Sequence, residues 1–487
     1  MMSRISSLRS PPASRARTHA AARRNGSPAA PGRPGSGPPS PLAERRVGEV
    51  RRWIYLYLFL LVFEGVLRKW LFGGVPLVSW GLLVVRDPVA VMIYLLAWRA
   101  EVFSRNLRAA SWLVLGGFSV LGMLQLLANP ELSFWVVLYG VRTYCLHVPL
   151  IFVMAEVLTG EDLQRIGRWL LLLAGPMAAL MVAQFLAPPD AFINRGTIGE
   201  FGQIGSALGR IRPAGTFSYN TGAESFNLLV AAFLLYAFVQ PGWVGRGVKW
   251  TALVALVAVL PVSGSRGFVL SLGLLIAFAL VGGIFHRRLL RVTLVSSGIG
   301  AGVFFLLTFT PFFREGLQTF ATRWDQALGE SGSVNEAIVQ RFFGEFIRAF
   351  QSLAETPLLG NGLGLGSNVG TALSMWAVGF LLAESEWERT VLEMGPVVAI
   401  LWLGARCALG AWVVRRAWVS LRRRDPLAWL LFGTECTAIF NGSMAQPTSL
   451  GFLVFTTGLC LAAARAGERG EGRPARRVRR RPVEAAA

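Results

Sequence analysis

Long runs of apolar residues, separated by short polar or basic segments, fill the chain from residue 51 to residue 465. Most runs reach about 18 residues, which is the length at which an α-helix crosses the hydrocarbon core of a bilayer. The pattern therefore predicts an all-α polytopic membrane protein with about twelve transmembrane helices. The expected helices lie near residues 53–72, 77–98, 110–128, 134–157, 167–187, 222–240, 249–263, 267–285, 291–310, 390–414, 427–445 and 449–465.

The two ends of the chain lack this pattern. Residues 1–50 are rich in Pro, Gly, Ser, Ala and Arg, and residues 466–487 include an arginine-rich run at 476–481. Such segments cannot bury enough apolar surface to fold. Both are expected to be disordered basic tails on either side of a membrane domain at 51–465.

Composition narrows the class of protein further. Of 487 residues, 53% are hydrophobic and only 15% are charged, which excludes an ordinary soluble domain. The net charge of +21 is concentrated in the tails and short loops, where it orients a membrane protein, so we expect no nucleic-acid partner. Four cysteines and three histidines show no metal-ligand spacing, and we expect neither a metal nor a cofactor.

Basic residues recur in every second loop, which predicts the orientation of the chain. Examples are Arg105 and Arg108 after the second expected helix and Arg287 after the eighth. Under the positive-inside rule these loops and both termini are cytoplasmic. The opposite side then receives residues 188–221, residues 263–267 and a large loop, 311–389, between the ninth and tenth helices.

Three arginines, Arg212, Arg266 and Arg341, each fall in one of these outward segments. Arginines that share the water-facing edge of a membrane protein suit an anion such as a lipid-linked phosphate or diphosphate. Ser218 or Asn220 is expected to cap the helix that follows Arg212. Taken singly, each arginine also fits an ordinary loop or a side chain that extends to the lipid headgroups.

Two further segments carry possible chemistry. The glycine run at 357–366 lacks the Lys-Ser/Thr pair of a nucleotide-binding loop, so close backbone packing is its simplest interpretation. In the acidic segment that follows, Glu384 or Glu386 is a candidate general base, with a solvated helix start as the alternative. Glu386, Arg389 and Glu393 have the spacing to share one helix face.

Charged residues inside the expected helices need partners, because an unpaired charge in a bilayer is costly. Glu64, Arg68 and Lys69 lie in the first expected helix, and Arg86 and Asp87 lie in the second. Pairing among them is expected to lock these two helices together.

The order of these motifs resembles the O-antigen ligase and O-antigen polymerase superfamily, including bacterial exopolysaccharide polymerases. The segments that carry the resemblance are Arg-Pro-x-Gly-Thr-Phe from Arg212, Ser-Gly-Ser-Arg-Gly around Arg266, Pro-Leu-Leu-Gly-x-Gly-x-Gly after Arg341, and Glu393-x-Gly. The chain departs from the ligases where they often place a His-Asn pair, because Glu384-Ser385 stands there.

The resemblance implies a GT-C-like polysaccharide polymerase of the bacterial inner membrane. Such an enzyme transfers glycan from undecaprenyl diphosphate to an acceptor glycan on the periplasmic face without a metal. It also implies that Arg212, Arg266 and Arg341 hold the diphosphate, and that other polysaccharide assembly proteins are partners. A ligase acting on lipid A-core and a transporter or flippase of lipid-linked oligosaccharide are the rival interpretations.

Overall fold

The computed structural model describes residues 41–197, 205–331, 344–373 and 385–469, and the regular elements in these ranges are helices, with one isolated bridge between Gly205 and Ile211. The helices are α1 (Pro41–Val66), η1 (Leu67–Leu71), α2 (Pro76–Leu83), α3 (Arg86–Arg99), α4 (Arg105–Ala128), α5 (Phe134–Cys145), α6 (Leu150–Val157), α7 (Gly160–Leu186), η2 (Phe192–Asn194), α8 (Asn220–Val239), α9 (Arg246–Val262), α10 (Arg266–Phe285), α11 (Arg287–Leu307), α12 (Pro311–Ser331), α14 (Gly344–Glu355), α15 (Asn368–Leu373), α16 (Glu386–Arg422), α17 (Leu427–Asn441) and α18 (Pro447–Arg469).

The helices confirm an all-α protein of membrane type. Within the described ranges, nine helical segments are long and apolar enough to cross a membrane. They coincide with nine of the twelve expected stretches, and the other three stretches are helical in α1, α9 and α17. That α1, α9 and α17 also cross the membrane stays a prediction.

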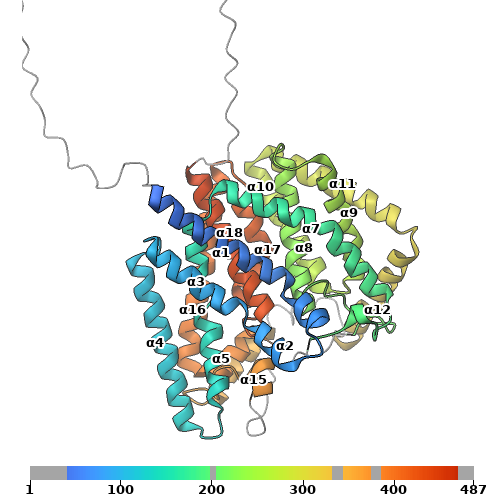
Figure 1. Cartoon of the computed structure of the whole chain (residues 1–487). Coiled ribbons are helices and arrows are strands. Elements are labelled where there is room, and N and C mark those ends of the chain that lie inside the picture. Colours follow the sequence, from blue (N-terminus) through green and yellow to red (C-terminus); the bar gives the residue numbers. More distant parts are fainter. Residues whose placement is uncertain (1–40, 198–204, 332–343, 374–384, 470–487) are drawn as a thin grey trace, which may run out of the picture. The chain divides into compact units, whose positions relative to one another are not determined.

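The centre of the helical unit is α18, which is buried along almost its whole length. It packs against α6, α8, α16 and α17, and Figure 1 shows α17 and α18 enclosed by other helices. The ends of the unit differ from expectation. The first helix begins at Pro41, inside the stretch assigned to the basic tail, and already buries Val50; the last helix extends to Arg469.

A buried set of charges joins the first two expected helices, as predicted. Glu64 on α1 pairs with Arg68 Nη1 at 3.4 Å and with Arg86 Nε of α3 at 3.1 Å. The neighbouring Lys69 Nζ donates to the carbonyl oxygen of Gly215 at 2.7 Å. These contacts fix the end of α1 against the segment that follows Arg212, so they position that segment as well as the two helices.

The glycine run lies against a break in α16. Gly395 interrupts the helix with φ of 77°, and a Cβ atom at this residue would stand 2.2 Å from the carbonyl oxygen of Leu358. Gly360 has φ of 74°, and a Cβ atom there would stand about as close to the backbone carbonyl of Glu393. Only glycine tolerates such contacts at positive φ. The structure therefore supports close packing as the purpose of the run.

Candidate anion site

The segment that carries Arg212 begins with a tight hairpin. Ser206 N donates to Arg210 O at 2.6 Å, and Leu208 and Gly209 turn the chain with φ of 57° and 69°. Arg210 then fastens the hairpin to two helices. Its Nε donates to Glu315 Oε1 of α12 at 2.6 Å, and its Nη1 donates to the carbonyl oxygen at the end of α7. Arg212 thus belongs to a loop that Arg210 fixes to both α7 and α12.

The helix that follows is not capped as the sequence suggested. Tyr219 is the N-cap residue of α8, and its side chain makes no cap hydrogen bond. The hydroxyl of Ser218 accepts from Arg68 Nη1 at 3.1 Å, and Asn220 Nδ2 donates to Glu224 Oε1 at 2.9 Å. The expected cap is wrong because both candidate side chains are engaged elsewhere.

The turn between α9 and α10 meets this loop. Ser265 caps α10, with Phe268 N donating to its hydroxyl at 3.2 Å, and Arg266 is the first residue of the helix. Gly264 has φ of 58°, and a Cβ atom there would stand 3.7 Å from Arg212 Cγ and 3.9 Å from Arg323 Nη1. Arg212 and Arg323 therefore both lie beside the Gly264 turn.

Arg323 comes from α12, which docks on the end of α9. A Cβ atom at Gly316 would lie 3.3 Å from Pro261. The guanidinium of Arg323 reaches the turn and donates to Gly264 O at 3.0 Å. Partial burial, followed by the positive charges of Arg212 and Arg266, lowers the pKa of Arg323 to about 10, and Glu224 opposes this shift.

These observations define an arginine cluster, formed by Arg212, Arg266 and Arg323. Its members come from the loop before α8, the first turn of α10 and the middle of α12. Burial, and after it repulsion by Arg212 and Arg266, lowers the pKa of Arg323, which still leaves that group charged at neutral pH. Three guanidinium groups around one small glycine turn can bind an anion with several oxygen atoms.

The structure brings together two of the three predicted arginines. Arg341 lies outside the described residues. Sequence reasoning did not find Arg323, which lies in the large loop at 311–389. The signal that could have found it is the helical spacing in α12, where Phe313, Phe320 and Trp324 recur beside Arg323.

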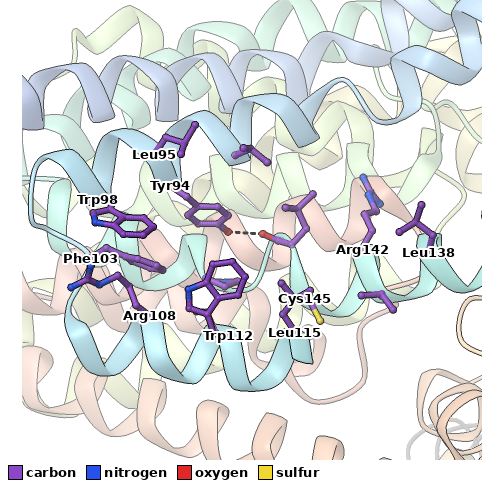
Figure 2. Close-up of a pocket in the computed structure, with 15 residues that line it drawn as sticks. Tyr94, Leu95, Trp98, Phe103, Arg108, Trp112, Leu115, Leu138, Arg142 and Cys145 are labelled. Atoms are coloured by element: carbon purple, nitrogen blue, oxygen red, sulfur yellow. Dashed lines mark hydrogen bonds between the residues drawn. The ribbon is translucent and has the colours of Figure 1, made fainter. Parts of the chain in front are cut away.

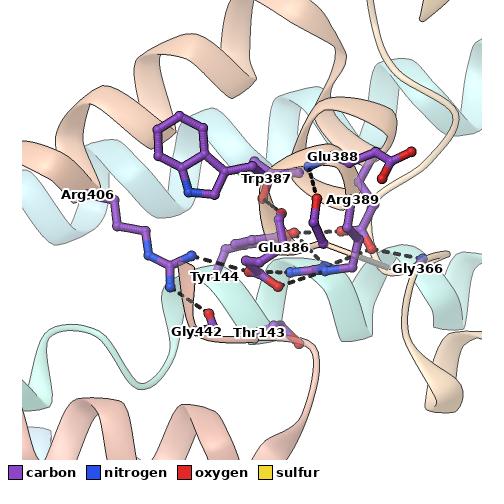
Figure 3. Close-up of polar contacts among 12 residues, drawn as sticks. Thr143, Tyr144, Gly366, Glu386, Trp387, Glu388, Arg389, Arg406 and Gly442 are labelled. Atoms are coloured by element: carbon purple, nitrogen blue, oxygen red, sulfur yellow. Dashed lines mark hydrogen bonds and ion pairs between the residues drawn. The ribbon is translucent and has the colours of Figure 1, made fainter. Parts of the chain in front are cut away.

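The acidic segment forms a separate and buried network at the start of α16 (Figure 3). Arg389 pairs with Glu386 at 2.6 Å and with Glu393 at 2.8 Å, which confirms the predicted shared helix face. Tyr144 of α5 donates to Glu393 Oε2 at 2.7 Å. Arg406 approaches Glu386 at 3.4 Å and donates to backbone carbonyls of residues 438, 439 and 442.

This network favours a structural role for Glu386. Its side chain is 1% exposed, and both carboxylate oxygens receive guanidinium groups. Glu384 lies outside the described residues, so its place relative to the arginine cluster stays a prediction. Glu388 is half-buried, and its nearest cationic contact is Arg348 at 3.8 Å.

The fold and its charged residues define a helical membrane protein with a candidate anion site at the arginine cluster. No protein-family model matches the chain, and no curated protein matches it. The resemblance to polysaccharide polymerases therefore depends on the motifs quoted above.

Proposed function

We propose that the protein is an inner-membrane polysaccharide polymerase that transfers glycan from undecaprenyl diphosphate to an acceptor sugar on the periplasmic face. The observation that supports this most is the arginine cluster. It gathers three positive charges from segments that the distribution of basic loops assigns to one side of the membrane. A diphosphate with its hydrocarbon tail in the bilayer is the anion that such a position suits.

The chemistry of transfer explains why the charges would matter. The acceptor hydroxyl attacks the anomeric carbon, the bond from that carbon to the diphosphate oxygen breaks, and the diphosphate leaves with one more negative charge. Groups held in place where charge develops stabilise the transition state more than the ground state. The cluster would supply this stabilisation without a metal.

A carboxylate is needed to take the proton of the acceptor hydroxyl. We infer that Glu224 is the better candidate among the described residues, because its charge acts on Arg323 and Asn220 orients one of its oxygens at 2.9 Å. Glu386 is enclosed by its own arginine partners. Glu384 remains the second candidate.

Conservative changes in the cluster test the proposal. Lysine keeps the charge but loses the planar fork that grips two phosphate oxygens. In proteoliposomes with synthetic lipid-linked repeat units, Arg212→Lys, Arg266→Lys and Arg323→Lys are each expected to lower glycan extension by about 10². Normal extension in all three variants would show that the cluster does not hold the diphosphate.

The chain offers matched controls. Arg314 is exposed on the same helix as Arg323, and exposed Arg195 lies over the ring of Phe192 in the segment before Arg212. Arg314→Lys and Arg195→Lys are expected to retain activity. Transfer of a single glycan to lipid A-core without lengthening would instead identify a ligase. Movement of the carrier across the bilayer without any transfer would identify a transporter.

The proposal also requires the cluster to face outward. In a variant without the four natural cysteines, Gln318→Cys on α12 and Arg422→Cys at the end of α16 place exposed thiols at the two predicted sides. A membrane-impermeant maleimide is expected to label the first in cells with a permeabilised outer membrane and to spare the second. The reverse pattern would place the cluster in the cytoplasm.

A further inference from the structure

A groove of about 390 Å³ lies between α3, α4 and α5 (Figure 2). The residues that line it are distant in sequence from the arginine cluster. Its surface is almost wholly apolar, and aromatic rings form much of it. The lining residues used below are Tyr94, Trp98, Phe103, Arg108, Trp112 and Arg142. Trp98 and Trp112 are more than half exposed, so the groove opens outward between the helices.

The walls of the groove are fixed by specific contacts. Tyr94 donates to the carbonyl oxygen of Leu146 at 2.5 Å, and its ring stacks on Phe103 with centroids 5.9 Å apart. Arg142 at the far end is neutralised, because its Nε and Nη2 donate to Asp87 at 2.8 and 2.6 Å. The groove wall from Tyr94 to Arg142 is therefore preformed and apolar, and the charge of Arg142 is balanced by Asp87.

The opposite end carries uncompensated positive charge. The guanidinium of Arg108 lies 5.4 Å from the ring centroid of Trp98, and its Nε is buried with no hydrogen-bond partner in the described part of the chain. Arg108 makes no ion pair with any residue that the structure describes. Arg105 lies one turn earlier on α4, and Arg46 donates to Arg99 O at 3.1 Å, so further cations flank this end.

We propose that the groove binds an anionic phospholipid, with one acyl chain along the aromatic wall and the phosphate at Arg108. The basic loop at this end is on the predicted cytoplasmic side, where anionic lipids attract basic residues and basic pockets between helices bind their headgroups. Tryptophans at the groove mouth suit the level of the headgroups. The site is distinct from the arginine cluster, which the same rule places on the other side.

A second groove provides an internal comparison. It has a similar volume of about 380 Å³ between α8, α9, α10 and α11, but no charged residue lines it. A hydrocarbon chain alone would occupy both grooves without preference for a headgroup. A lipid recognised through its phosphate would be held at the first groove only.

Native mass spectrometry of the full chain in detergent tests the proposal. Phosphatidylglycerol is expected to be retained in preference to phosphatidylcholine with the same acyl chains. Arg108→Gln is expected to weaken retention of phosphatidylglycerol about fivefold, which is the effect of one basic residue at a membrane surface. Arg105→Gln, on the same helix but outside the lining, is the matched control and is expected to have less effect.

Filling the groove separates lipid binding from general effects of charge. Leu115→Trp is expected to remove the preference for phosphatidylglycerol, whereas Ala301→Trp in the second groove is expected to keep it. Equal retention of the two lipids by the unmodified protein, or an unchanged preference in both Arg108→Gln and Leu115→Trp, would overturn the proposal. Displacement of phosphatidylglycerol by a polyprenyl phosphate at equal concentration would assign the groove to a carrier lipid and also overturn it.

Discussion

Two groups of charged residues in this protein are built in opposite ways. In the network at the start of α16, Arg389 and Arg406 face Glu386 and Glu393, so two cations balance two carboxylates. In the arginine cluster, three guanidinium groups gather, and one carboxylate, that of Glu224, opposes them in their effect on Arg323. The first group is fully buried, whereas the members of the second are half-buried.

The difference separates a network in which cations and carboxylates balance each other from a cluster in which like charges meet, where we propose that an anion binds. A balanced buried network satisfies its own hydrogen bonds, and removing one member leaves an uncompensated charge. A cluster of like charges costs free energy in the empty protein, and an anion that binds there relieves the cost. The comparison therefore predicts that changes in the network lower stability, whereas changes in the cluster lower activity.

The largest effect is expected at the carboxylate beside the cluster. Glu224→Gln keeps the shape and the contact with Asn220 but cannot accept a proton at neutral pH. Loss of a general base typically costs about 10² to 10⁴ in rate. We expect glycan extension to fall by that factor while the protein still accumulates in the membrane, as measured in proteoliposomes.

Glu388→Gln is the control for that change, because among the described residues Glu388 makes one long ion pair, with Arg348 at 3.8 Å. It is expected to leave the rate nearly unchanged. If Glu224→Gln kept normal turnover, Glu224 would not be the base. A loss in Glu384→Gln instead would return that assignment to the acidic segment.

The next effect is expected in the network and concerns stability. Glu386→Gln leaves Arg406 and Arg389 without half of their compensating charge, and breaking a buried pair costs about 3–5 kcal/mol. We expect a lower yield and a lower melting temperature, with normal activity per folded molecule. The measurement is thermal unfolding in detergent beside glycan extension. A stable Glu386→Gln protein that had lost activity would contradict the structural role and support a catalytic one.

Much of the fold was predictable because apolar runs leave few alternatives in a membrane. All twelve expected stretches are helical. Glu64 pairs with Arg68 and Arg86, as expected for a charge within an apolar helix. The first helix begins before the expected boundary at residue 50. Four of the ten residues 41–50 are charged, which favoured a tail, yet these residues belong to α1 and Val50 is buried. Composition alone does not show where a helix begins.

The candidate site was predictable only in part. Arg212 and Arg266 stand beside the apolar runs, so topology alone placed them on one side. Arg323 lies in a long segment that the basic loops predict to face outward, and the sequence does not show how α12 folds back on the turn at Gly264. Glu386 seemed available because helix spacing reveals Arg389 but not Arg406, which is distant in sequence. Contacts between distant segments decide which charges are already satisfied.

The smallest effect is expected from ligand binding to the cluster. Inorganic pyrophosphate should raise the melting temperature of the unmodified protein, because an anion that binds only the folded state stabilises it by about 2.7 kcal/mol at a hundredfold excess over Kd. Added salt should weaken this gain, since the contacts are electrostatic and half-exposed. Glu386→Gln should keep the gain despite its lower starting stability, because its network lies apart from the cluster's contacts.

Arg323→Gln sharpens the comparison. It removes one guanidinium and its hydrogen bond to Gly264 O, but it also removes a partly buried charge that Arg212 and Arg266 repel; burial and this repulsion together lower the pKa of Arg323. The two changes oppose each other, so the empty protein should lose less stability than Glu386→Gln does, while the response to pyrophosphate disappears. A loss of stability as large as that of Glu386→Gln, with the response to pyrophosphate retained, would show that the cluster holds the fold rather than an anion.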